Sequence, residues 1–173
     1  MEDIQLLNED HTWDDFDCGV PELNEFLKHH ADDYVPRGVC RVWVLCHSGT
    51  RRIAAYYASS ASSLVRTLLP RPQQAGLPGF PMPTVLLGQL ARCRSYEAKG
   101  VGLLLIAHFL EQAVAVSERI GVFAVELVAL DDRLVKYYQD TIGFHALRVL
   151  GNGRTHMYML VDEVRAVLRK ASE

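Results

Sequence analysis

The chain has 173 residues and a mass of 19.4 kDa, which is the size of one folded domain, so we predict a single domain over residues 1–173. Hydrophobic residues make up 49% and charged residues 23%, a balance that excludes an intrinsically disordered chain. No apolar run reaches the roughly 18 residues of a membrane span, and Met1–Glu9 lacks a basic start followed by an apolar stretch. We therefore expect a cytoplasmic protein without membrane contact.

The first half of the chain predicts one helix among several strands. Pro21 suits the first turn of a helix, and the apolar residues after it recur at helical spacing as far as Pro36, which must lie beyond the helix end. Runs of β-branched and aromatic residues predict strands, and a proline-rich stretch predicts a loop. In chain order we expect a short strand over 4–7, a helix between 21 and 36, strands over 39–46 and 52–60 around a hairpin loop at 47–50, and a loop without regular structure over 69–83.

The second half alternates strands with helices. A buried strand is predicted over 84–91, and a glycine turn leads to a helix from Leu103, whose apolar residues recur at i, i+3, i+4 and i+7. The remaining expected elements are a strand over 122–130, a short helix over 131–140 capped by Asp131 or Asp132, strands over 144–150 and 155–161, and a final helix. This order predicts an α/β fold with a mixed central sheet flanked by helices.

The formal net charge of −3 conceals an asymmetry along the chain. The first 35 residues hold 11 Asp and Glu against one Lys, so the rest of the chain carries a net charge of +7. One interpretation is a solvated acidic helix on a mildly basic domain. The other is a basic surface for a polyanionic ligand, such as a phosphorylated cofactor or RNA, with the acidic lobe turned away.

The cysteines show no metal-binding spacing. None of the four forms a C-x-x-C pair, and thiols of an intracellular chain stay reduced. We expect them to pack as small apolar residues, and we expect no metal site; they are Cys18, Cys40, Cys46 and Cys93.

A glycine turn between the 84–91 strand and the next helix is a candidate anion site. The N–H groups at a helix start lack partners, and the helix dipole adds partial positive charge there. Gly100 and Gly102 allow a phosphate to approach the backbone closely, and Lys99 adds a full charge. The turn lacks both the Gly-Lys-Ser/Thr of a Walker loop and the third glycine of a dinucleotide fingerprint. An ordinary tight turn is the alternative.

Tyr138 is a second candidate, at the end of the short helix over 131–140. Of the adjacent Tyr137 and Tyr138, only one can face a given cleft. A phenol with a pKa near 10 is a poor base at neutral pH but can donate a proton to a leaving group. A half-buried core tyrosine is the alternative.

Together these pieces resemble the GCN5-related N-acetyltransferase (GNAT) family. The cofactor motif of that family, Gln/Arg-x-x-Gly-x-Gly/Ala after a central strand, is matched by Glu97-Ala98-Lys99-Gly100-Val101-Gly102. The similarity runs from about Trp13 to Leu160 and is more specific for the GNAT toxins of type II toxin–antitoxin systems. Their typical runs are matched by Phe16-Asp17-Cys18-Gly19, Leu23-Asn24-Glu25-Phe26-Leu27, Ala55-Tyr56-Tyr57-Ala58-Ser59-Ser60-Ala61-Ser62 and Leu87-Gly88-Gln89-Leu90-Ala91.

The resemblance implies the GNAT fold and acetyl-coenzyme A as the acetyl donor. The diphosphate of the donor would lie on the N–H groups from Lys99 to Leu103, and its pantetheine arm along the edge of the central strand. An amine would attack the thioester carbonyl directly, and Tyr138 would protonate the leaving thiolate. The implied cofactor-binding residues are Leu90, Ala91, Arg92, Lys99, Gly100, Val101, Gly102 and Leu103.

The resemblance also implies an acceptor, the α-amino group of aminoacyl-tRNA, whose acetylation blocks translation. The strand over 84–91 contains no Asp or Glu to act as base, which favours an α-amino group of pKa ~8 over a lysine of pKa ~10.4. A small DNA-binding antitoxin is the expected partner, and the resemblance allows a homodimer. Candidate contacts to tRNA phosphates are Arg37, Arg41, Arg66, Arg71, Arg92 and Arg94.

The chain departs from the family pattern at three places. The cofactor motif begins with Glu97 and Ala98, and Gln89 replaces a typical arginine. Four residues separate Tyr138 from Gly143 where the family commonly has three, so Tyr137 is the alternative acid. Two other functions remain open: acetylation of a small-molecule amine or a protein N-terminus, and a catalytically impaired GNAT-fold binding module.

Overall fold

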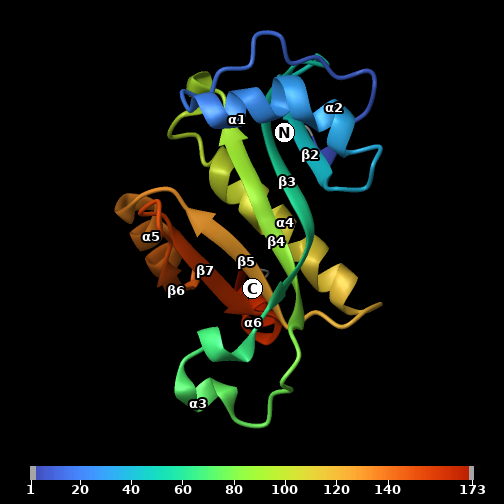
Figure 1. Ribbon diagram of the computed structural model, residues 1–173. Helices are drawn as coiled ribbons and strands as arrows, with labels where there is room; N and C mark the ends of the chain where they lie inside the picture. Colours follow the sequence, from blue (N-terminus) through green and yellow to red (C-terminus); the bar gives the residue numbers. More distant parts are fainter. Residues whose placement is uncertain (1–2, 172–173) are drawn as a thin grey trace. The chain divides into compact units, whose positions relative to one another are not determined.

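The computed structural model describes residues 3–171 (Figure 1). The chain divides into two compact units. Unit 1 contains the chain up to Ser60 together with Gly88–Phe109, and unit 2 contains Ala61–Leu87 together with the chain from Leu110 onward. Strands β3 (Ile53–Leu64) and β4 (Met82–Arg92) and helix α4 (Val101–Ser117) each contribute residues to both units. The single-domain organisation expected for residues 1–173 stays a prediction.

In unit 1, the acidic part of the chain folds as one interrupted helix over the first strands. Helix α1 (Pro21–Glu25) starts at the proline, continues through a π-helical turn (Phe26–His30) and ends as α2 (Ala31–Tyr34), as the sequence predicted. The helix runs beside β2 (Arg41–Cys46) and β3 (Figure 1). Its buried side chains belong to the same core cluster as side chains of these two strands. The core of unit 1 includes Phe16, Phe26, Leu27, Ala31, Val42, Val44, Ile53, Tyr56, Ala91 and Cys93.

The strands of unit 1 form an antiparallel arrangement. The short β1 (Gln5–Leu6) pairs with β2, and β2 pairs with β3 through the predicted hairpin. The isolated bridge between Thr12 and Arg52 holds the loop after β1 against the start of β3, through Thr12 N–H to Arg51 O at 2.9 Å and Ile53 N–H to Thr12 O at 2.8 Å. This contact brings the acidic N-terminal segment next to two arginines.

Unit 2 contains the parallel crossover. Residues Thr84–Leu87 of β4 pair in parallel with Ala124–Leu127 of β5 (Ala124–Ala129). Strand β7 (Thr155–Leu160) pairs antiparallel with β5, and β6 (His145–Val149) pairs antiparallel with β7. Asp131 caps α5 (Asp132–Tyr137), since its Oδ1 accepts the Leu134 N–H at 2.8 Å. Helix α6 (Val161–Ala171) closes the described chain.

Across the described residues, the strands form a seven-stranded mixed sheet in the order β1-β2-β3-β4-β5-β7-β6. The predicted α/β class with flanking helices is therefore confirmed. None of the helices within residues 3–171 is both long and apolar enough to cross a membrane. All four cysteines are free thiols, with Cys46 and Cys93 buried.

The prediction of a loop without regular structure over 69–83 is wrong. A short helix, α3 (Arg71–Gln74), follows a 3-10 turn at Arg66–Leu68, and β4 already begins at Met82. Pro72 is the second helical residue, a position whose N–H needs no acceptor within the helix. The Gln74 side chain also donates to Leu69 O at 2.8 Å, so proline here sits at the start of a helix instead of preventing one.

Candidate active site

The end of β4 is held in place by backbone hydrogen bonds within unit 1. Cys93 N–H donates to Ala54 O at 2.7 Å, and Arg94 N–H donates to Asp17 O at 3.1 Å. Ala91 is buried in the core, whereas its neighbours Leu90 and Arg92 are only partly covered. The predicted arm-binding stretch is thus a fixed strand end with partly accessible side chains.

The glycine turn leads directly into α4, as predicted. Ala98 has a φ of +59° and Gly100 a φ of +73°, so the backbone turns through two left-handed residues before the helix. The first helical bond of the turn joins Leu104 N–H to Gly100 O at 3.1 Å. The N–H groups of Val101, Gly102 and Leu103 consequently have no acceptor within the helix and are oriented toward its start.

The space beside the two glycines of this helix start is open. Among the described residues, no heavy atom outside the immediate chain neighbours and the helix backbone lies within 4 Å of a Cβ placed on Gly100 or Gly102. A phosphate needs this kind of close approach to backbone N–H groups. The cofactor turn, defined here as residues 97–103, therefore has the form of an anion site.

The two charged side chains of the cofactor turn do not fill that space. The Glu97 carboxylate lies 3.6 Å from Arg92 Nη2, with 74% of its side chain exposed. The Lys99 ammonium lies 5.0 Å from the centre of the Tyr96 ring, a cation–π contact. Glu97 is therefore compensated by an arginine of β4, and the Lys99 ammonium lies against the Tyr96 ring.

Tyr138 belongs to unit 2 and is the more buried of the two candidate tyrosines. Only 7% of Tyr138 is exposed, and burial raises the pKa of its phenol to about 12. Its ring packs edge-on against Tyr137 and Phe144, with centroid distances of 5.6 and 6.0 Å. Tyr137 is half-buried, and burial raises the pKa of its phenol as well. The phenol of Tyr138 stays protonated throughout the neutral range.

The extra residue after Tyr138 is accommodated by a π-helical turn over Tyr138–Ile142. Gly143 N–H donates to Tyr138 O at 2.9 Å, which closes an i to i+5 ring in place of the usual i to i+4 ring. Gly143 ends the turn with a φ of +103°, a conformation that other residues avoid. The wider turn absorbs the additional residue locally before β6 begins.

Unit 2 also holds a buried polar cluster that the sequence analysis missed. Glu126 of β5 is 2% exposed, its Oε2 lies 2.6 Å from His156 Nε2 of β7, and its Oε1 accepts the hydroxyl of Thr84 of β4. Thr84 is 3% exposed, and 13% of the His156 side chain is exposed. Three strands far apart in the sequence supply this cluster, so only a period-2 pattern combined with the strand order could have predicted it.

The acidic N-terminal segment is not turned away from the basic residues. Three of its carboxylates pair with arginines of unit 1, at distances of 3.7, 2.7 and 3.3 Å for Asp10–Arg51, Asp15–Arg52 and Asp17–Arg94. Hydrogen bonds from Asn24 and from the Gly19 N–H, helped by Arg94, lower the pKa of Asp17. Three of the six arginines proposed for phosphate contacts are already paired with carboxylates: Arg37 with Asp33, Arg92 with Glu97, and Arg94 with Asp17.

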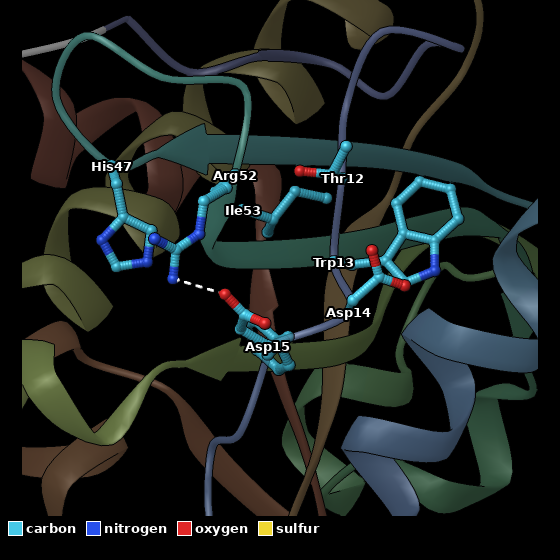
Figure 2. A pocket seen from close by; sticks show the side chains of 8 residues that line it. Thr12, Trp13, Asp14, Asp15, His47, Arg52 and Ile53 are labelled. Carbon is cyan, nitrogen blue, oxygen red and sulfur yellow. Dashed lines mark ion pairs between the residues drawn. The ribbon is translucent and has the colours of Figure 1, made fainter.

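A cavity of about 180 Å³ lies in unit 1 beside this segment (Figure 2). Figure 2 shows Arg52 and His47 on one side of the cavity and Trp13 and Asp14 on the other, with the Arg52–Asp15 ion pair at its edge. None of the predicted site residues lines it. Among residues 3–171, no group of three or more His, Cys, Asp or Glu is placed to hold a metal ion.

Comparisons with known proteins show which proteins the chain resembles. No protein-family model matches the chain. The chain is 26% identical over 153 residues to the tRNA-acetylating toxin of Mycobacterium tuberculosis (strain ATCC 25618 / H37Rv), covering 88% of each protein. It also resembles solved structures of the toxin AtaT, which differ in what the toxin binds.

The complex of AtaT with acetyl-methionyl-tRNAfMet matches with a TM-score of 0.85 at 26% identity, over 95% of this chain and 98% of that one. AtaTR bound with acetyl-CoA matches with a TM-score of 0.81 at 27% identity, over 95% and 96%. A tyrosine-to-phenylalanine mutant of AtaT, bound to the C-terminus of the antitoxin AtaR, matches with a TM-score of 0.79 at 25% identity, over 95% and 96%. The chain therefore has the GNAT fold, as its sequence predicted, and is similar in sequence and structure to the GNAT toxins of type II toxin–antitoxin systems.

Proposed function

We propose that the chain is an acetyl-CoA-dependent N-acetyltransferase that acetylates the α-amino group of aminoacyl-tRNA and thereby acts as a translation-blocking toxin. The observation that carries this proposal is the open helix start at Val101–Leu103, with free space in front of Gly100 and Gly102. The similarity to a tRNA-acetylating toxin and to AtaT bound to acetyl-methionyl-tRNAfMet supports the choice of acceptor.

Unit 1 would bind the donor. The N–H groups from Lys99 to Leu103 would hold the diphosphate of acetyl-CoA, with Val101, Gly102 and Leu103 supplying donors that the helix leaves free. The partly covered edge at Leu90–Arg92 would hold the pantetheine arm. Arg92 lies close enough to Glu97 to neutralise it, which lowers the repulsion between that carboxylate and the diphosphate.

Unit 2 would stabilise the leaving group. Acetyl-CoA supplies an activated thioester, the amine attacks its carbonyl carbon, and the C–S bond breaks. A phenol with a pKa of about 12 holds its proton more tightly than a thiol of pKa ~8.5, so Tyr138 acts chiefly by donating its O–H to the developing thiolate. Burial favours this role, because a hydrogen bond in a low-dielectric site is stronger than one in water.

A toxin that acetylates aminoacyl-tRNA would act in the cytoplasm, where charged tRNA is used for translation. A small DNA-binding antitoxin is the expected partner, and the binding of AtaT to the C-terminus of AtaR supports it. A homodimer stays a prediction.

The decisive experiment incubates the purified chain with a pool of aminoacyl-tRNA and isotopically labelled acetyl-CoA. Nuclease digestion and mass spectrometry should then show the label on the α-amino group of the aminoacyl-adenosine. Tyr138→Phe serves as the catalytic control, and calorimetry with acetyl-CoA measures donor binding separately. Absence of donor binding at millimolar concentration would instead favour a GNAT-fold binding module. Label on a small amine or a protein N-terminus alone would identify the other enzyme function.

A further inference from the structure

Thr84, Glu126 and His156 form a buried polar cluster, at positions where apolar residues would be enough for core packing. A carboxylate that loses its water must be compensated by donors, and both oxygens of Glu126 have one. Thr84 donates its hydroxyl to Oε1, so that oxygen acts as an acceptor. In the tautomer in which His156 donates its Nε2–H to Glu126, the lone pair of the imidazole lies on Nδ1.

The strand registers fix the cluster on one face of the sheet of unit 2. Thr84 is paired with Ala124, two residues before Glu126, and His156 is paired with Val128, two residues after it. Side chains alternate between faces, so the three residues lie on the same face in a row across β4, β5 and β7. The 13% of the His156 side chain that is exposed marks the end of the row that water or a ligand can reach.

A histidine oriented by a buried carboxylate through one nitrogen, with the other nitrogen free, is the arrangement of a general base. Among the described residues, this face also carries Arg148, which is paired in register with His156, and His145 and Tyr158, which are paired with each other, and Glu163 of α6 contacts His145. A second His–Glu pair, His145 with Glu163 at 2.7 Å, has nearly the same length, but 44% and 40% of its side chains are exposed. Burial therefore distinguishes the two pairs.

We propose that His156 is the general base of the acetyl transfer, with Glu126 and Thr84 as its positioning residues. This inference rests on the proposed function. His156 Nδ1 takes a proton from the α-ammonium group, and the neutral amine forms the N–C bond with the thioester carbonyl. The C–S bond then breaks, the sulfur gains the second amine proton with the help of the Tyr138 hydroxyl, and His156 returns its proton to water.

A base in unit 2 changes what the sequence implies about the acceptor amine. The absence of Asp and Glu in the strand over 84–91 favoured an amine that is already partly neutral. An α-amino group of pKa ~8 is still mostly protonated at pH 7, so a base accelerates even this acceptor.

The test compares His156→Gln with His145→Gln, using an aminoacylated RNA minihelix and labelled acetyl-CoA. Each glutamine keeps an N–H donor for the neighbouring glutamate but removes the basic nitrogen. We expect His156→Gln to lower kcat/KM by about 100-fold at pH 7, with the loss shrinking above pH 8, as general-base catalysis predicts. His145→Gln should stay within about twofold of the wild type. Equal rates for the two variants would overturn the proposal.

Glu126→Gln tests the positioning role. We expect kcat to fall by about tenfold while the affinity for acetyl-CoA stays unchanged, because the amide holds the His156 ring in place less firmly. An unchanged kcat would remove Glu126 from the mechanism.

A measurement on the wild type keeps the proposal testable if a variant does not fold. The pH–rate profile of the wild type is measured with two aminoacyl groups whose α-amino groups differ in pKa. If an enzyme base removes the proton, the acid limb of the profile, where the rate falls toward low pH, lies at the same pH for both substrates. If the amine attacks unassisted, the acid limb follows the pKa of the amine. A limb that follows the amine would therefore overturn the proposal. If the wild type transfers no acetyl group to any aminoacyl-RNA, the proposed function itself fails, and this outcome is distinct from transfer that does not depend on His156.

Discussion

The two units have different roles in the proposed reaction, and they use different chemical groups for them. In unit 1, the cofactor turn relies on backbone N–H groups and empty space, and its charged side chains are exposed and paired. In unit 2, the chemistry lies in side chains, with Tyr138, Glu126 and Thr84 each at most 7% exposed. Binding of a large anionic donor needs an accessible helix start, whereas proton transfer benefits from a dry, fixed environment. Substitutions in unit 1 should consequently affect affinity, and those in unit 2 turnover or stability.

The largest effect is expected at Tyr138. Tyr138→Phe should lower kcat by at least about 100-fold with little change in the affinity for acetyl-CoA, because it removes one hydroxyl donor and keeps the packed ring. Steady-state kinetics and calorimetry measure the two quantities. Tyr137→Phe is the matched control and should be nearly neutral. Weaker donor binding with unchanged kcat would contradict the acid role.

The next effect concerns the stability of unit 2. Thr84→Val preserves shape but leaves one oxygen of the buried Glu126 carboxylate without its donor. We expect the free energy of unfolding to fall by about 2 kcal/mol, the cost of an unsatisfied buried acceptor. Urea unfolding measures it, with the exposed Thr67→Val as control. A loss no larger than that of the control would mean that Glu126 finds another donor.

A smaller effect on affinity should follow from filling the space at the cofactor turn. Gly102→Leu places a side chain where no described residue lies within 4 Å, so the fold should tolerate it while the diphosphate is displaced. We expect the Kd for acetyl-CoA to rise by about tenfold, or roughly 1.4 kcal/mol, at an unchanged Tm. Gly102→Ala should change the Kd much less. Unaltered affinity of the leucine variant would place the donor elsewhere.

The smallest effect is expected at Glu97. Glu97→Gln removes a negative charge near the expected diphosphate and releases Arg92, so acetyl-CoA should bind about two- to threefold more tightly at low salt. The gain should disappear in 1 M salt, where exposed charges are screened. Calorimetry at the two salt concentrations checks this. Equal affinity at low salt would show that the carboxylate lies too far from the ligand to matter.

The same contrast explains how much could be predicted from the sequence. The cofactor turn is local, since Gly100, Gly102 and the following apolar stripe are contiguous, and the mixed sheet follows from the order of its strands. The row of Thr84, Glu126 and His156 spans more than 70 residues, and each member alone is typical of an ordinary strand. The helix at Arg71–Gln74 differs from the predicted loop because proline is tolerated in the first turn of a helix. How Tyr138 meets the donor stays a prediction.

The π-helical turn after Tyr138 has a consequence for changes of chain length. Tyr138 O accepts the Gly143 N–H across five residues. Removing one residue between Tyr138 and Gly143 would shorten this to the four-residue spacing of an α-helix, and β6 would still begin after the same glycine. A single-residue deletion in this turn would change how the Tyr138 phenol is oriented relative to β6. Such an indel offers a way to tune the orientation of this side chain that point substitutions do not provide.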